Sequence, residues 1–217
     1  MKRMLIIFVL CFSFGTLFAQ SAVGLKNAGN AAMEAKDYKK ALENYEKAMA
    51  SWGSEPKNFA MISNAGSCAY KLKDYPKAIK YFDLLIAGNA QTEQTYMFKA
   101  NSYKMLKKDD ECIKTYNDGL TNFPQSALIK DGFSKYYRAE SKIHYIQGTK
   151  IYKVVADKVT AKKMKTTDPG YLSEAAKAKK EFDTAITLID KSLAINPNDD
   201  EAKKVKAACE QNLGAIQ

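Results

Sequence analysis

Small and apolar residues recur every three or four positions along most of the chain, which is the spacing of an amphipathic α-helix. In the segment after Asp37, Ala41, Tyr45 and Ala48 lie at positions i, i+4 and i+7, so they share one face of a helix. The positions between them are mostly charged or polar and form a face suited to water. The pattern predicts an all-α protein.

This helical pattern occurs three times, at offsets of 37 and then 34 residues. Each unit has a small residue, an aspartate about eight positions later, and then small and aromatic residues at helical spacing; the units are marked by Gly29 with Tyr45, Gly66 with Phe82, and Ala100 with Tyr116. Such a period is typical of stacked supersecondary units. We expect each unit to be two antiparallel helices, with the second helix capped by Asp37, Asp74 or Asp109.

The order of small residue, Asp-Tyr turn, small residue, aromatic residue and closing Pro124 resembles the tetratricopeptide repeat. The resemblance covers residues 22–124, as three helix pairs. It implies a solenoid of stacked helix pairs whose first helices line a binding groove.

The C-terminal part resembles a fourth, interrupted unit over residues 125–197. Gly148 and Pro197 are 49 positions apart, where Ala100 and Pro124 of the third unit are 24 apart, which implies an insertion of about 25 residues that extends the pair into a long helical hairpin. We expect one long helix or two consecutive helices over 126–165, a turn over 166–170 and a returning helix over 172–195. Residues 198–217 are predicted to form a capping helix that covers the apolar end of the stack.

The N-terminus has the pattern of a secretory signal peptide over residues 1–19. Lys2 and Arg3 precede an apolar run of 15 residues, and Ala19 is a small residue at a plausible cleavage point. The alternative is an uncleaved anchor, although the run is short for a bilayer. We expect an exported protein of the periplasm or cell envelope. The three later cysteines are expected to be small buried residues, with one disulfide as the alternative: Cys68, Cys112 and Cys209.

Charge and residue types exclude several function classes. The 34 basic residues outnumber the 24 acidic ones, giving a net charge of +10, but Arg3 and Arg138 are the sole arginines, which argues against nucleic-acid binding. His144 is the sole histidine, so neither a histidine-pair metal site nor an HExxH motif exists. GxGxxG and GxSxG motifs are absent too. We therefore expect no enzyme activity, no metal and no cofactor.

The resemblance implies that a protein or peptide partner lies in a groove lined by the first helices. The expected groove residues are Lys26, Asn27, Asn30, Asn64, Tyr70, Phe98 and Asn101. Asparagine can both donate to and accept from a peptide backbone. In the chaperone-binding subfamily of these repeats a clamp of Lys and Asn side chains holds a C-terminal carboxylate. Lys26, Asn30 and Asn64 match three clamp positions, but Gln94 and Phe98 stand where the two cations belong.

The predicted hairpin is the second candidate for a functional surface. Residues 150–180 contain nine lysines and three acids. Lys158, Lys162 and Lys165 are spaced as one helical stripe, which indicates either a solvated face or a docking surface for an anionic lipid, polymer or acidic protein of the envelope. A third interpretation is a structural subunit of a larger envelope assembly. The oligomeric state is left open by the sequence.

Overall fold

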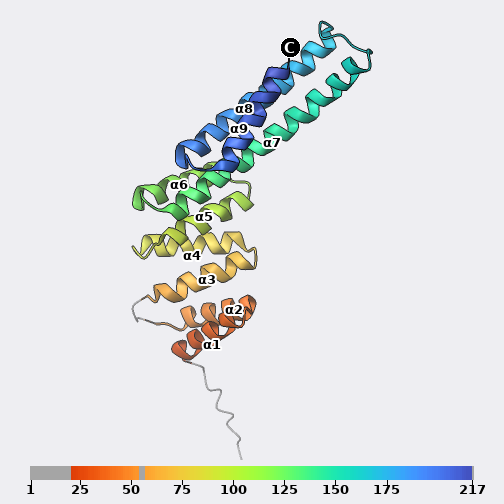
Figure 1. Cartoon of the computed structure of the whole chain (residues 1–217). Coiled ribbons are helices and arrows are strands. Elements are labelled where there is room, and N and C mark those ends of the chain that lie inside the picture. Colours follow the sequence, from red (N-terminus) through yellow and green to blue (C-terminus); the bar gives the residue numbers. More distant parts are fainter. Residues whose placement is uncertain (1–20, 54–56, 217) are drawn as a thin grey trace, which may run out of the picture.

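The computed structural model describes residues 21–53 and 57–216, and within these ranges the chain forms nine α-helices and no strand (Figure 1). The helices are α1 (Ala22–Glu34), α2 (Tyr38–Ala50), α3 (Phe59–Lys71), α4 (Tyr75–Ala87), α5 (Glu93–Met105), α6 (Asp109–Asn122), α7 (Ala127–Thr160), α8 (Pro169–Ile195) and α9 (Asp200–Ala215). Consecutive helices pack as antiparallel pairs that stack on one another (Figure 1). The predicted fold class is confirmed. The predicted signal peptide, residues 1–19, lies outside the described residues.

The turn inside each of the first three pairs has the same construction. It is three residues long, and its middle residue is a lysine with positive φ: 60° at Lys36, 64° at Lys73 and 58° at Lys107. The residue after that lysine stands at the N-cap position of the second helix, and in the first two pairs its side chain caps the helix. Asp37 and Asp74 accept hydrogen bonds from the amides of Lys40 and Lys77, at 3.1 and 3.2 Å.

The predicted cap at Asp109 is wrong. The repeat offset of 34 residues places Lys108 at the position equivalent to Asp74, and Lys108 makes no side-chain cap bond. Asp109 is instead the first residue of α6, where its negative charge favours the positive end of the helix dipole. Burial raises the pKa of Tyr136 on α7, and the Asp109 carboxylate raises it further.

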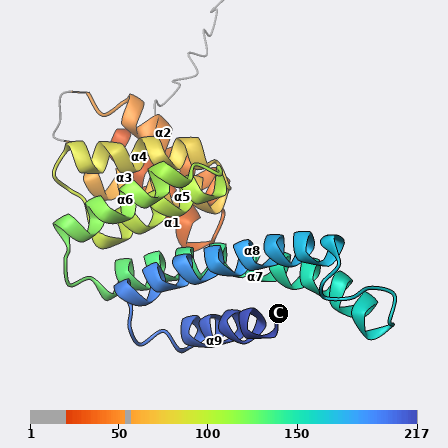
Figure 2. The same ribbon diagram turned by 90° about the horizontal axis from the view of Figure 1, so that it is seen from above.

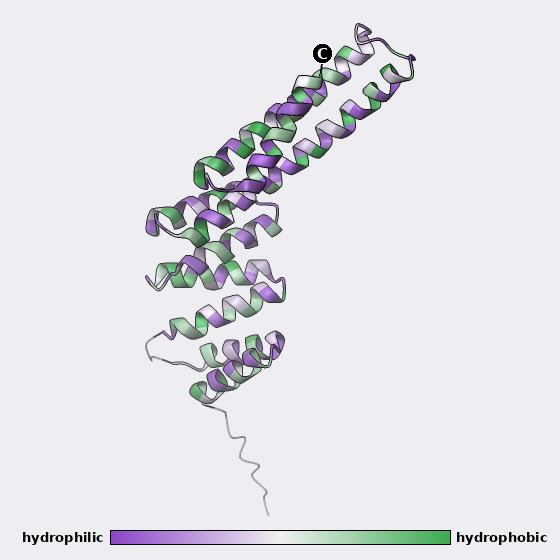
Figure 3. Ribbon diagram, viewed as in Figure 1, coloured by the Kyte–Doolittle hydropathy of each residue, from purple (hydrophilic) through white to green (hydrophobic). Residues whose placement is uncertain are grey.

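Glycine allows the two helices of a pair to approach closely. A Cβ atom added at Gly29 would lie 2.6 Å from Cε1 of Tyr45, and one added at Gly66 would lie 2.8 Å from Cε1 of Phe82. Tyr45 and Phe82 are almost completely buried. Figure 3 shows hydrophobic and hydrophilic residues alternating along the helices.

The fourth pair, α7 and α8, is a long hairpin that extends beyond the stack (Figures 1 and 2). α7 is one unbroken helix of 34 residues, which decides between the two alternatives for this segment. Its first half packs against α5 and α6 through Phe133, and its second half packs against α8 through Val155. The connection runs over residues 161–168, because α7 ends at Thr160 and α8 begins at Pro169. The turn predicted at 166–170 therefore overlaps this connection, but its last two residues already belong to α8.

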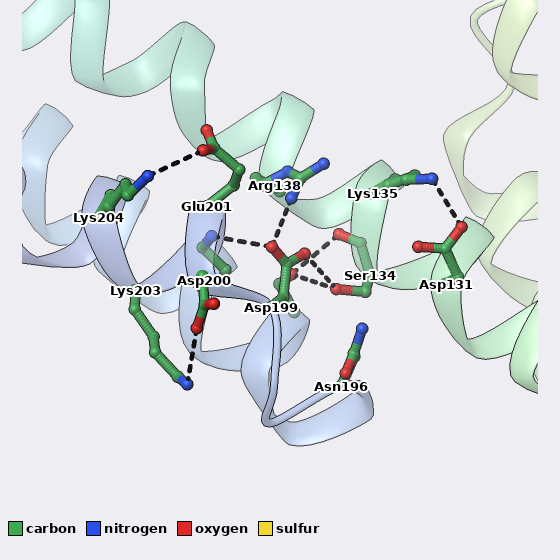
Figure 4. Close-up of polar contacts among 12 residues, drawn as sticks. Asp131, Ser134, Lys135, Arg138, Asn196, Asp199, Asp200, Glu201, Lys203 and Lys204 are labelled. Carbon is green, nitrogen blue, oxygen red and sulfur yellow. Dashed lines mark hydrogen bonds and ion pairs between the residues drawn. The ribbon is translucent and has the colours of Figure 1, made fainter.

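A buried polar cluster anchors α9 to the hairpin (Figure 4). Asp199 caps α9 by accepting from the Ala202 amide at 3.0 Å, accepts from the Ser134 hydroxyl at 3.0 Å, and pairs with Arg138. Ser192 donates to the Ser134 carbonyl at 2.9 Å. Burial raises the pKa of Asp199, but its hydrogen bonds and the Arg138 charge outweigh burial, so the pKa lies below its ordinary value. The cluster joins α7, α8 and α9.

Candidate partner-binding face

The first helix of each pair and α9 form a surface that we call the first-helix face. It is made by α1, α3, α5, α7 and α9, and it has a hollow at three of its helix junctions. The α1–α3 hollow encloses about 390 Å³ and is lined by Asn30, Met33, Glu34, Tyr45 and Asn64. The α5–α7 hollow encloses about 210 Å³ and the α7–α9 hollow about 270 Å³.

Two of the predicted groove asparagines meet in the α1–α3 hollow around a buried tyrosine. The Tyr45 hydroxyl donates to Oδ1 of Asn30 at 2.8 Å, and Nδ2 of Asn64 donates to the Tyr45 hydroxyl at 3.3 Å. Nδ2 of Asn64 is also 3.5 Å from Oδ1 of Asn30. Burial raises the pKa of Tyr45, and the hydrogen bond from Asn64 partly offsets that rise. The network ties α1, α2 and α3 together.

Asn101 has the same role in the third pair. Its Oδ1 accepts a hydrogen bond from the Tyr116 hydroxyl at 3.0 Å, and Tyr116 lies 15 positions later in the chain, as Tyr45 does after Asn30. Burial raises the pKa of Tyr116 well above its usual range. The asparagine Nδ2 groups of Asn30 and Asn101 make no hydrogen bond to another described residue.

Tyr70 and Phe98 lie together between the second and third pairs. Their ring centroids are 5.0 Å apart, and Phe98 also stacks on Phe82 at 6.2 Å. Both side chains are half-buried, so their packing leaves an aromatic edge at the surface. Phe98 stands at one of the two positions where the carboxylate clamp of chaperone-binding repeats has a cation, so this chain has an aromatic ring there instead of a positive charge.

Lys26 and Asn27 lie on α1, near the end of the stack. The Lys26 amine is 6.0 Å from the centre of the Trp52 ring, close enough for a cation–π contact. Asn27 is exposed. Lys26 thus contacts the end of the first pair, whereas Asn30 and Asn64 form the hollow.

The predicted lysine stripe on the hairpin is wrong as a helical feature. Lys158 is on α7, but the helix ends at Thr160, Lys162 has a positive φ of 56° and Lys165 lies in the loop. The backbone amide of Lys163 bonds to the carbonyl of Lys158 at 2.9 Å, which closes the helix end. All three predicted lysines are exposed and surround the hairpin tip instead.

Most hairpin lysines have no acidic partner. Within residues 150–180, which the structure describes throughout, Lys153 pairs with Asp157 and Lys177 pairs with Glu174. The side-chain amines of the other seven lysines have no carboxylate oxygen of a described residue within 4.0 Å, although the backbone amide of Lys165 donates to the Asp168 carboxylate at 2.8 Å. Among the described residues, most of these lysine amines are therefore not paired with an acid.

Sequence reasoning missed the two hollows that involve α7. The α5–α7 hollow is lined by Met97, Asn101, Lys104, Asp131, Gly132, Lys135 and Tyr136, and the α7–α9 hollow by Lys142, Tyr145, Ile146, Lys204, Val205 and Ala208. Ile143 and Ile146 on α7 are 59% and 63% exposed. Ile143 and Ile146, two isoleucines about one helical turn apart, are the signal that could have indicated this surface.

The described residues hold few groups suited to catalysis or metal binding. His144 pairs with Glu181 across the hairpin, with Nδ1 2.7 Å from the carboxylate. The three described cysteines are buried and unpaired, and burial raises the pKa of Cys68 and Cys209 to about 11 and that of Cys112 to about 12. In the part of the chain that the structure covers, no three acidic, histidine or cysteine side chains are grouped as metal ligands. No described helix has the length and hydropathy needed to cross a bilayer.

Comparison with known proteins identifies the repeats. Residues 26–92 match the family model described as tetratricopeptide repeat, while no curated protein sequence matches the chain. Among solved structures, a TPR repeats protein from Bacteroides fragilis is 24% identical, with a TM-score of 0.50, over 89% of this chain and 99% of that one. A tetratricopeptide repeat protein from Parabacteroides merdae is 15% identical, with a TM-score of 0.47, over 87% of this chain and 84% of that one. Residues 26–92 are therefore similar to tetratricopeptide repeats, and the remaining described helices continue the same antiparallel helix-pair fold.

Proposed function

We propose that the protein is a non-enzymatic interaction scaffold whose first-helix face binds a peptide or protein partner. The observation that carries the proposal is the row of three hollows at junctions between first helices. Two of them are smaller than the roughly 300–1,000 Å³ of pockets that enclose a small molecule. These two hollows are large enough for one side chain each. An extended polypeptide could therefore place one side chain in each hollow along the face.

The chemistry of the face changes along the stack and suits a polypeptide. The α1–α3 hollow offers amide groups, Tyr70 and Phe98 offer an aromatic edge, and the α7–α9 hollow is apolar. Amide groups match a peptide backbone, and apolar hollows match side chains. Together they favour a partner that spans several helix pairs.

The proposal places the protein in the periplasm or cell envelope. The argument for this location is the pattern of residues 1–19, in which charged residues precede an apolar run, as is typical of a cleaved export signal. N-terminal sequencing of the protein recovered from the envelope fraction tests this part. A mature chain that starts near Gln20 supports it, and an intact Met1 in the cytoplasmic fraction contradicts it.

Bulky charged substitutions test the face directly. Glu34→Arg with Met97→Arg alters two hollows, and Glu43→Arg with Asn117→Arg introduces the same side chains on exposed positions of α2 and α6. We expect the first variant to lose the proteins that wild-type protein captures from envelope extract, and the control to retain them. Equal capture by both variants, with circular dichroism unchanged, would refute the proposal.

A second candidate function is docking to an anionic surface of the envelope through the hairpin tip. The seven hairpin lysines without an acidic partner favour it. Each lysine near an anionic membrane contributes about 1 kcal/mol, so Lys158, Lys162 and Lys165 would together contribute about 3 kcal/mol, or roughly 150-fold in affinity.

Charge reversal at matched positions tests the second candidate. Lys158, Lys162 and Lys165 are changed to Glu in one variant, and the exposed Lys39, Lys40 and Lys71 in the control, so that both have the same net charge. Flotation with vesicles containing phosphatidylglycerol should then fail for the hairpin variant only, and wild-type binding should weaken steeply with salt. Equal loss in both variants would indicate a net-charge effect and reject the hairpin as the docking site.

A further inference from the structure

The α7–α9 hollow is an apolar site at the C-terminal end of the first-helix face, distinct from the amide-lined α1–α3 hollow. Its floor is made by Tyr145 and Ile146 of α7 and by Val205 and Ala208 of α9. Nothing in the described chain covers Ile146, which is 63% exposed, and Ile143 beside it is 59% exposed. A terminal helix normally presents a polar outer face, so this apolar surface is not explained by capping.

The dimensions of the hollow limit what it can hold. Its lining positions on α7 run from Lys142 to Ile146, and those on α9 from Lys204 to Ala208. Four residue steps along a helix span about 6 Å. The enclosed volume is about 270 Å³. A site of this length and volume admits one large apolar side chain and leaves the rest of the ligand outside.

Two lysines give the rim of the hollow an excess of positive charge. Lys142 and Lys204 stand on the two helices and share one carboxylate, Glu201, at 3.9 and 3.3 Å. Figure 4 shows the Lys204–Glu201 pair at the start of α9. One carboxylate against two amines leaves a net positive charge beside an apolar floor, and the lining includes no acidic residue.

We propose that the α7–α9 hollow binds an acidic segment of a protein partner, in which one leucine or phenylalanine enters the hollow and flanking carboxylates pair with Lys142 and Lys204. An apolar anchor supplies the affinity of such a contact, and the charges at the rim select the partner and its orientation. The site deepens the proposed function of the first-helix face and rests on it.

Fluorescence anisotropy with a labelled probe peptide tests the proposal. The probe is a 12-residue peptide with one phenylalanine flanked by glutamates on both sides, and the control probes replace the phenylalanine with serine or the glutamates with lysines. We expect the acidic phenylalanine probe to bind at least about tenfold more tightly than either control probe. Binding that is equal for the acidic and lysine probes, or that does not need the phenylalanine, overturns the proposal.

Protein variants locate the probe. Ile146→Ser removes an apolar residue of the hollow that is 63% exposed, and Val154→Ser removes an apolar residue of α7 outside the hollow that is 53% exposed. Lys142→Glu with Lys204→Glu reverses the rim, and Lys179→Glu with Lys180→Glu reverses two exposed lysines of α8. The two hollow variants, Ile146→Ser and Lys142→Glu with Lys204→Glu, should weaken probe binding about tenfold or more. The two control variants should leave probe binding within twofold of wild type.

The alternatives and the parent proposal give different results. Dimerisation of the wild type that Ile146→Ser abolishes would identify a second copy as the occupant and overturn the inference. If Ile146→Ser binds the probe like wild type, the inference fails. The proposed function can still hold in that case, because capture of proteins from envelope extract can still be lost in Glu34→Arg with Met97→Arg. If Glu34→Arg with Met97→Arg captures the same proteins from envelope extract as wild type, the proposed function fails, whatever the probe peptide does.

Discussion

Replacement of Asp199 by Ala should release α9 from the hairpin while leaving the rest of the stack folded. The side chain of Asp199 is 7% exposed and that of Arg138 is 19% exposed, so the substitution leaves a largely buried guanidinium without its carboxylate. It also removes the cap of α9 and the partner of the Ser134 hydroxyl. Loss of a helix cap costs about 1 kcal/mol, and loss of one member of a buried ion pair about 3–5 kcal/mol.

We expect a total loss of about 4–6 kcal/mol, concentrated in α9, because α9 contacts α7 and α8 and no other described element to a comparable extent. Hydrogen exchange monitored by mass spectrometry measures this as a fall of at least about 100-fold in the protection of α9 amides, with α1 to α4 unchanged. Asp200→Ala is the matched control. It removes an exposed pair with Lys203, at 3.1 Å, which is worth less than about 1 kcal/mol. Equal protection in the two variants would refute the role assigned to the buried cluster.

The same carboxylate predicts a pH dependence. The pKa of Asp199 is lower in the folded protein than its value of about 3.9 in an unfolded chain. Its contribution to stability is therefore complete above about pH 4 and is lost as the pH falls toward the lowered folded pKa. The protection of α9 in wild type should decrease below pH 4, and that of Asp199→Asn should change much less. Parallel acid profiles would contradict the assignment.

Three further predictions concern the packed core. Gly29→Ala should lower the free energy of unfolding by about 1–3 kcal/mol in urea denaturation, because the added Cβ would overlap Tyr45. Gly214→Ala is the control: a Cβ added there in α9 meets nothing within 4 Å, so this variant should be neutral or stabilising. Asn30→Ala should destabilise the protein by about 1–3 kcal/mol, more than Tyr45→Phe, because it leaves a buried hydroxyl without its acceptor; equal urea midpoints would contradict this. Site-resolved mass spectrometry should find iodoacetamide adducts at pH 8 only after unfolding, since burial raises the pKa of all three thiols, at Cys68, Cys112 and Cys209.

The helix-pair fold was predictable because its determinants are local and repeated. Gly29 with Tyr45 and Gly66 with Phe82 recur at a fixed offset, and each pair belongs to one unit. The register of the third turn was harder to read, because an acidic residue follows the true cap position, Lys108, and resembles the aspartate caps of the other units. Local composition also could not place the end of α7, which is set by the left-handed conformation of Lys162.

The candidate site was predictable in part. The spacing of 15 residues between Asn30 and Tyr45, and between Asn101 and Tyr116, is visible in the sequence, but a hydrogen bond between them requires the pairing of two helices. The contact of Ser134 with Asp199, 65 positions apart, has no local signal at all. The α7–α9 hollow likewise depends on how the last helix docks on the hairpin, which is a tertiary property.

Site-specific photocrosslinking in living cells tests the central claim most directly. A benzoylphenylalanine is placed at Asn27, Glu34 or Met105 on first helices, and at Glu43, Asp83 or Asn117 on second helices, all of them exposed positions. The account predicts crosslinks to the same partner from the first-helix positions and none from the second-helix positions. A partner crosslinked from the second-helix positions alone would show that the first-helix face is not the binding surface.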